Sequence, residues 1–286
     1  MARTGILGFL LAAAICSQMA AGQNSSNPNS SPQNLSPNEL VRKVVAHELE
    51  ADDQDHTHWM YRDKVEIPAP GKTTMVVETR EGDLACLDEI GNRPLTAEQR
   101  SAEAQRIRQF VGDASAQRKA RRASAADDQK STELFSILPD AFVFRAEETT
   151  GDTVKLGFEP NPEFHPHSME AYVFHKMSGS VTVNTRELRL AEISGTLTKG
   201  VEFAGGLLGH LDAGGTFDAR QTEVAPGVWK IIRLKVDMRG KVLFFKTIGD
   251  QEDETRSDFK QMPDTMTLSQ AEQMLLKGGA EKAAGD

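Results

Sequence analysis

The sequence predicts an α+β protein built on a large antiparallel sheet that is strongly curved into an open, or half, β-barrel and covered by helices. Strand-like segments separated by short turns fill residues 154–249, and short connections favour antiparallel neighbours. An amphipathic helical pattern precedes the strands, and a charged helical segment interrupts them at about residues 96–131. We expect these two helical segments to cover the sheet.

The chain begins with the pattern of a secretory signal peptide. Arg3 precedes an apolar run over residues 6–15, and small residues follow at 20–22. The run is much shorter than the roughly 20 residues that a membrane-spanning helix needs. We expect cleavage near Gly22 and export to the periplasm, with the mature chain soluble or bound peripherally to a membrane. Lipidation of Cys16 is the alternative.

Composition divides the rest of the chain. Residues 23–36 are almost entirely Asn, Ser, Gln and Pro, which cannot bury a core, so we expect a disordered linker. Residues 37–286 are expected to form a single domain. Its last residues, from about 278 to 286, are expected to fray.

The first helix is predicted from a capping box. Ser36 and Glu39 have the required spacing, Pro37 suits the first turn, and apolar residues then recur at helical spacing up to Leu49. Strands are expected to follow at 58–65, 73–80 and 84–90.

A second capping box, Thr96 with Gln99, begins the charged helical segment. Gly112 is a natural break in it, which suggests a helical hairpin. The basic stretch at 118–122 is either a solvated helix face or a lid or contact with anionic lipid headgroups.

Most of the later chain is predicted as strand. The expected segments are 142–145, 154–158, 171–174, 179–184, 189–197, 201–208, 214–224, 227–238 and 241–248. A short helix at 268–277 closes the chain. The acidic run at 252–254 is expected to be a solvated face.

Several functional classes are disfavoured. The formal net charge of −9 and the low aromatic content argue against nucleic-acid binding. Loss of Cys16 with the signal peptide would leave Cys86 without an intramolecular partner, so we expect it to be a small, buried apolar residue. The sequence contains no catalytic or cofactor-binding motif, so we expect neither an enzyme nor a bound cofactor.

Histidines supply a metal-dependent alternative. They form two His-x-His pairs, His56 with His58 and His165 with His167. Alternate residues of an extended chain project to the same side, so each pair could chelate a metal ion.

The order of certain segments resembles a known family. These are the Trp/Tyr strand at 59–62, the strand end at 88–95, and the runs at 156–162, 177–184 and 228–231. From about residue 37 to 249 the chain is similar to exported bacterial proteins of unassigned role with an outer-membrane lipoprotein carrier (LolA/LolB-like) fold. The resemblance implies an incomplete antiparallel barrel around helices, with an apolar cavity for acyl chains. The helical segment at 96–131 is longer and more charged than in the carrier.

We therefore expect an exported, non-catalytic protein that holds a lipid, an acyl chain or a lipoprotein in an apolar cavity. Burying an acyl chain gains roughly 0.8 kcal/mol per CH₂, so no polar motif is required. Large aromatic side chains are the usual filler between a sheet and its helices, so the alternative is a structural or interaction module of the cell envelope without a ligand. The aromatic residues expected to line the cavity are Trp59, Tyr61, Phe158, Phe203, Phe217 and Trp229.

Overall fold

The computed structural model describes residues 35–203, 209–242 and 251–285. The predicted signal peptide, its cleavage near Gly22, the lipid on Cys16 and nearly all of the linker lie outside the described residues. So do the ends of the strands expected at 201–208 and 241–248.

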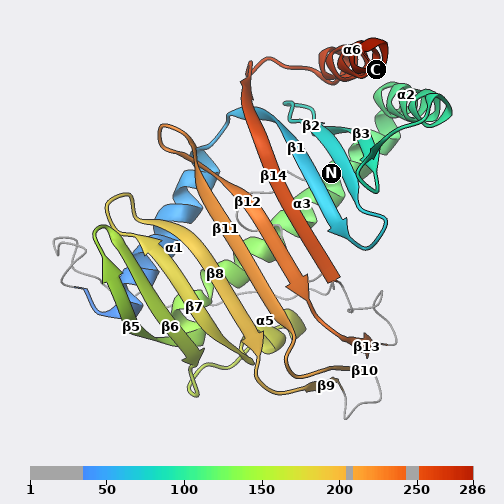
Figure 1. Ribbon diagram of the computed structural model, residues 1–286. Coiled ribbons are helices and arrows are strands. Elements are labelled where there is room, and N and C mark those ends of the chain that lie inside the picture. Colours follow the sequence, from blue (N-terminus) through green and yellow to red (C-terminus); the bar gives the residue numbers. More distant parts are fainter. Residues whose placement is uncertain (1–34, 204–208, 243–250, 286) are drawn as a thin grey trace.

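One open antiparallel sheet of eleven strands dominates the fold (Figure 1). In chain order its strands are β1 (His58–Ile67), β2 (Lys72–Val77), β3 (Leu84–Ile90), β4 (Arg93–Pro94), β5 (Phe142–Thr150), β6 (Thr153–Pro160), β7 (Met177–Asn184), β8 (Arg189–Leu197), β11 (Thr216–Ala225), β12 (Val228–Asp237) and β14 (Gln251–Met262). Their order in the sheet is β4-β3-β2-β1-β14-β12-β11-β8-β7-β6-β5. The edges β4 and β5 do not meet among the described strands, which confirms a large open antiparallel sheet in an α+β fold.

A second, smaller sheet has three short strands in the order β13-β10-β9. They are β9 (Val201–Phe203), β10 (Gly209–Leu211) and β13 (Gly240–Val242).

The described residues form six helices: α1 (Pro37–Gln54), α2 (Ala97–Gly112), α3 (Ala114–Ser136), α4 (Leu138–Ala141), α5 (Met169–Phe174) and α6 (Leu268–Gly285). In Figure 1, α1, α3 and α5 lie behind the sheet, whereas α2 and α6 lie side by side near β3. The predicted capping boxes begin α1 at Ser36 and α2 at Thr96. The break at Gly112 separates α2 from α3, and α3 extends beyond the predicted end at 131.

The strand β14 is a correction to the sequence prediction. The acidic run at 252–254 was expected to be a solvated face, but it belongs to a central strand that pairs with both β1 and β12. Glu254 and Arg256 are buried there. Their opposite charges make the segment polar in sequence although it lies inside the sheet.

The strand predicted at 171–174 is wrong. These residues belong to α5, because the Ser168 hydroxyl caps the helix by accepting a hydrogen bond from the Ala171 N–H at 3.1 Å. Tyr172, Val173 and Phe174 favour strands intrinsically, and the cap outweighs that preference. At the C-terminus, α6 continues to Gly285, where the sequence predicts a frayed end.

Three buried apolar clusters hold the elements together. The first lies between α1, α4 and α5 and strands β5 to β8, and includes Phe142 and Phe158. The second joins α2 and α6 to β2 and β3 around Ile107. The third contains Trp59 and Tyr61 of β1. Within the described part of the chain, no helix is long and apolar enough to cross a membrane.

Candidate functional site

The pairing register separates two faces of the large sheet. Directly paired residues project to the same face, and successive residues of a strand project to opposite faces. Phe217 pairs with Val236, and Leu234 on the same strand pairs with Glu254. Phe217 belongs to the core cluster beneath α1, so all of these residues lie on the helix-covered face.

The same reasoning assigns the residues of β1 to the two faces of the sheet. Asp63 pairs with Arg256, two residues along β14 from Glu254, so Asp63 and Tyr61 also lie on the helix-covered face. Arg62 and Lys64 project to the outer face.

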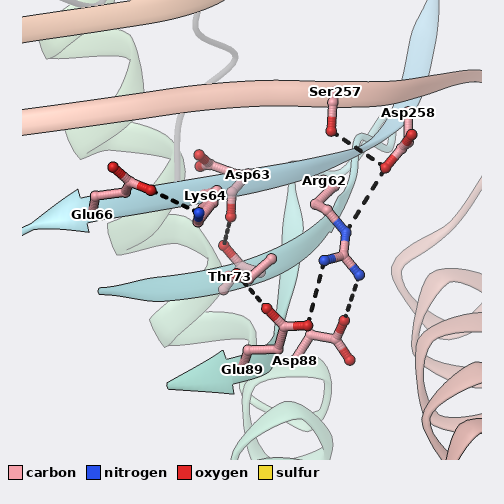
Figure 2. A network of polar contacts seen from close by, with 10 residues as sticks. Arg62, Asp63, Lys64, Glu66, Thr73, Asp88, Glu89, Ser257 and Asp258 are labelled. Carbon is pink, nitrogen blue, oxygen red and sulfur yellow. Dashed lines mark hydrogen bonds and ion pairs between the residues drawn. The ribbon is translucent and has the colours of Figure 1, made fainter. Parts of the chain in front are cut away.

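A polar network around Arg62 occupies this part of the outer face (Figure 2). Its guanidinium lies 3.0 Å from Asp88 and 3.6 Å from Glu89, both on β3, and 3.8 Å from Asp258 on β14. Thr73 donates a hydrogen bond to Glu89 at 3.0 Å. Partly exposed ion pairs of this kind are worth at most about 1 kcal/mol each, and the network ties β1 to its neighbours.

Half of the helix-covered face is filled by the protein itself. Phe158, Phe203 and Phe217, three of the predicted lining residues, are buried in the first apolar cluster. The rings of Phe142 and Phe158 are 4.7 Å apart, and helix residues such as Val41 and Leu138 complete the packing. In this half, the protein's own helices cover the aromatic residues.

The other half lies around Trp59 and Tyr61. The Tyr61 ring stacks on Phe259 of β14 with centroids 5.4 Å apart, and Trp59 contacts the same ring edge to face at 6.4 Å. Val76 and Ala85 extend the apolar surface across β2 and β3. The structure therefore brings two of the predicted residues together in a separate aromatic patch.

The helix α3 crosses behind the sheet (Figure 1) and is held at its two ends. Near its start, Arg121 donates to the Glu81 carbonyl at 2.9 Å in the β2–β3 turn. Near its end, Leu134 and Phe135 are buried in the first cluster. Between these anchors, the half-buried stripe consists of Gln117, Ala120, Ser124 and Asp128, which recur at helical spacing. This stripe is small and polar rather than bulky and apolar.

A buried charged group lies beside the aromatic patch. Arg256 Nε donates to Glu254, and its guanidinium lies 5.5 Å from the centre of the Tyr61 ring. Burial, and next the neighbouring Glu254 carboxylate, raise the pKa of Asp63 to about 7 despite the lowering effect of Arg256. Asp63 Oδ1 is buried and has no hydrogen-bond partner among the described residues.

Trp229 lies elsewhere, at the end of α1. Its indole N–H donates to Glu187 at 2.9 Å, and the Arg189 guanidinium lies 5.8 Å from its ring. Trp229 and Arg189 border a pocket of about 310 Å³. The six predicted aromatic residues are thus divided among a filled core, the aromatic patch on β1 and this pocket.

The structure also places the remaining candidates. His58 is buried on β1, while His56, His165 and His167 are exposed. In the described ranges, no three His, Cys, Asp or Glu side chains are grouped as metal ligands would be. Cys86 is half-buried against the second cluster, and burial raises the pKa of its thiol to about 11. A thiol with that pKa is a poor nucleophile near neutral pH.

Sequence reasoning did not find the buried charges. Glu48 offered a signal, because it falls within the apolar stripe of α1 between Val45 and Leu49. A carboxylate at such a position requires a buried partner, and the structure provides Arg189 at 2.7 Å.

Comparisons with protein-family models, curated proteins and solved structures found no match.

Proposed function

We propose that this protein binds an apolar ligand, a lipid or the acyl chain of a lipoprotein, between α3 and the strands β1, β2 and β14. The observation that carries the proposal is the mismatch between the two surfaces. The sheet presents Trp59, Tyr61 and Val76, whereas the half-buried stripe of α3, the helix behind the sheet, contains Ala120 and Ser124.

A helix that packs permanently on a sheet fills the gap with bulky apolar side chains, as α1 does with Val41 and Val44. In this proposal, the small residues on the half-buried stripe of α3 allow the helix to admit methylene groups beneath it. Each CH₂ buried there would contribute roughly 0.8 kcal/mol, so a chain of about twelve would supply on the order of 10 kcal/mol before the cost of ordering it. Binding by shape needs no catalytic group.

The resemblance to outer-membrane lipoprotein carriers supports the same function. In this proposal the open sheet is a half-barrel, the chain is exported to the periplasm, and α3 covers the acyl chain. The buried group of Asp63, Glu254 and Arg256 would then border the polar end of the ligand.

A second candidate function, a ligand-free structural module of the cell envelope, is favoured by the filled half of the face. Phe158 and Phe217 are 2% and 6% exposed and touch the protein's own helices. The experiment below separates the two functions.

The test uses the mature chain, purified without detergent and extracted for mass spectrometry of bound lipid. Displacement of a dansylated fatty acid measures affinity. The substitution Ala120→Trp fills the space beneath α3, and we expect it to weaken fatty-acid binding at least tenfold. The control is Ala123→Trp, which places the same side chain on the exposed side of α3 and should bind normally. Absence of both extracted lipid and probe binding, or equal effects of the two substitutions, would refute the proposal.

A further inference from the structure

The exposed side of α3 carries a concentrated positive charge. Residues 114–126 contain four basic side chains and no acidic one, although the formal net charge of the whole chain is −9. Arg118, Lys119 and Arg122 are exposed. At 3.6 residues per turn, all three lie on the side of the helix opposite its half-buried stripe. These three side chains form the basic patch of α3.

The basic patch is uncompensated and repels itself. Among the described residues, no carboxylate forms an ion pair with any of its three side chains. Arg122 follows Arg118 by four residues and Lys119 by three, and like charges at these spacings destabilise a helix. A face that is only solvated usually mixes both signs, as residues 127–133 of the same helix do. An anionic partner would offset the repulsion within the patch.

Hydrogen bonds away from the patch hold this part of α3 in place. Arg121 donates to the Glu81 carbonyl at 2.9 Å, which ties the helix to the β2–β3 turn. Gln117 Nε2 donates to the carbonyls of Phe110 and Val111 at 3.0 and 2.8 Å, which ties it to the end of α2. The three charges are therefore presented on a fixed part of the surface.

The shape and composition of the patch favour a membrane surface over other anionic partners. Exposed side chains on the convex surface of a helix can contact a plane of charges but cannot surround one small anion. Ser115 and Ala126, exposed on the same side, offer neither an aromatic platform for nucleobases nor a bulky anchor for a protein partner. Anionic lipid headgroups form a plane of charges, and clustered Lys and Arg are sufficient to bind them.

We infer that the basic patch of α3 docks this protein onto anionic lipid headgroups at a membrane surface. Each Lys or Arg near such a surface strengthens binding roughly fivefold, so three together contribute on the order of a hundredfold. The negative charge elsewhere on the protein opposes docking weakly, because salt screens charges that lie more than about 8 Å from the headgroups. Docking depends on headgroup charge and burial of an acyl chain does not, so this inference does not rest on the proposed acyl site.

Co-sedimentation of the mature chain with phospholipid vesicles tests the inference. Vesicles of an equimolar mixture of phosphatidylglycerol and phosphatidylcholine are compared with vesicles of phosphatidylcholine alone, in low and in high salt. We expect binding to the anionic vesicles only, with an affinity that falls steeply as salt rises. No binding to the anionic vesicles, equal binding to the neutral ones, or binding that is insensitive to salt would overturn the inference.

Substitutions in the patch locate the binding. The triple variant Arg118→Gln/Lys119→Gln/Arg122→Gln removes the three charges and keeps good helix formers, and circular dichroism checks that it is folded. We expect its affinity for the anionic vesicles to fall on the order of a hundredfold. Arg122→Gln alone should lose roughly fivefold, which keeps the test available if the triple variant does not fold. Unchanged affinity in the folded variants would overturn the inference.

A matched control separates the patch from net charge. Lys72→Gln/Lys199→Gln/Lys260→Gln removes three exposed charges outside α3 and gives the same net charge as the patch variant. We expect it to keep most of the vesicle affinity, and an equal loss would contradict the inference. A DNA duplex and polyglutamate serve as other polyanions. Tighter binding to either of them than to the anionic vesicles would assign the patch to a different partner and overturn membrane docking.

Discussion

Asp63 should make the stability of this protein fall as the pH rises from about 4 to about 7. The side chain projects from β1 beside Glu254 and Arg256. Burial is the largest influence on its pKa, and the Glu254 carboxylate adds to it, so the pKa rises from 3.8 to about 7. The folded protein therefore holds a proton that the unfolded chain releases near pH 4.

The sign follows from this difference in bound protons. Between pH 4 and pH 7 the folded state binds more protons than the unfolded state, so raising the pH favours unfolding. Each pKa unit corresponds to about 1.4 kcal/mol, and the shift of roughly three units gives an upper figure of about 4 kcal/mol lost by pH 8. Asp63→Asn has nearly the same volume and no proton to lose, so it avoids this cost.

Urea denaturation at pH 4, 5, 6, 7 and 8 measures the effect. We expect the free energy of unfolding of Asp63→Asn, relative to the unsubstituted chain, to increase steadily with pH and to level off above pH 7. Glu66→Gln on the same strand is the control, because Glu66 is solvated and Lys64 lowers its pKa. A pH-independent difference for Asp63→Asn, or a matching trend for Glu66→Gln, would refute the reasoning.

Three further predictions concern stability and reactivity. Arg189→Met should destabilise the fold by about 3–5 kcal/mol in urea denaturation, because the single change leaves the buried Glu48 carboxylate without its cation. Adding Glu48→Gln should recover most of this loss. Gly179→Ala should cost about 1–3 kcal/mol or more, since its Cβ would clash with the Ser194 carbonyl oxygen, while Gly112→Ala, with open space around it, should cost nothing. Alkylation of Cys86 by iodoacetamide should be slow at pH 8 and accelerate up to about pH 11; a rate at pH 8 equal to that of an unhindered thiol would contradict the raised pKa.

Local patterns predicted the helix starts and most strands, because their causes are local. The capping boxes at Ser36 and Thr96 need only neighbouring residues, and so does the alternation of Trp59 and Tyr61. The strand β14 could not be found in this way. One of its two partners, β1, lies almost two hundred residues earlier, and its buried positions include Glu254 and Arg256, whose charges compensate each other.

The candidate site was also predictable only where its causes are local. Aromatic residue type suggested Trp59 and Phe158 as lining of a ligand cavity, and the structure buries both on the helix-covered face. Residue type could not say which helix would lie over each one, because that depends on packing between distant segments. The pocket beside Trp229 likewise needs α1, β8 and β12 to meet.

The side chains that cover the aromatic residues distinguish a filled core from a ligand site better than the aromatic residues themselves do. Phe158 and Trp59 are 2% and 3% exposed, so burial does not distinguish them. Their clusters differ, since valines of α1 belong to the cluster of Phe158, whereas no helix residue belongs to the described cluster of Trp59. Replacing Trp59 would alter both the sheet and any ligand contact, and a loss of binding would have two explanations. A substitution on α3 leaves the sheet unchanged, so Ala120→Trp compared with Ala123→Trp tests the proposed space alone.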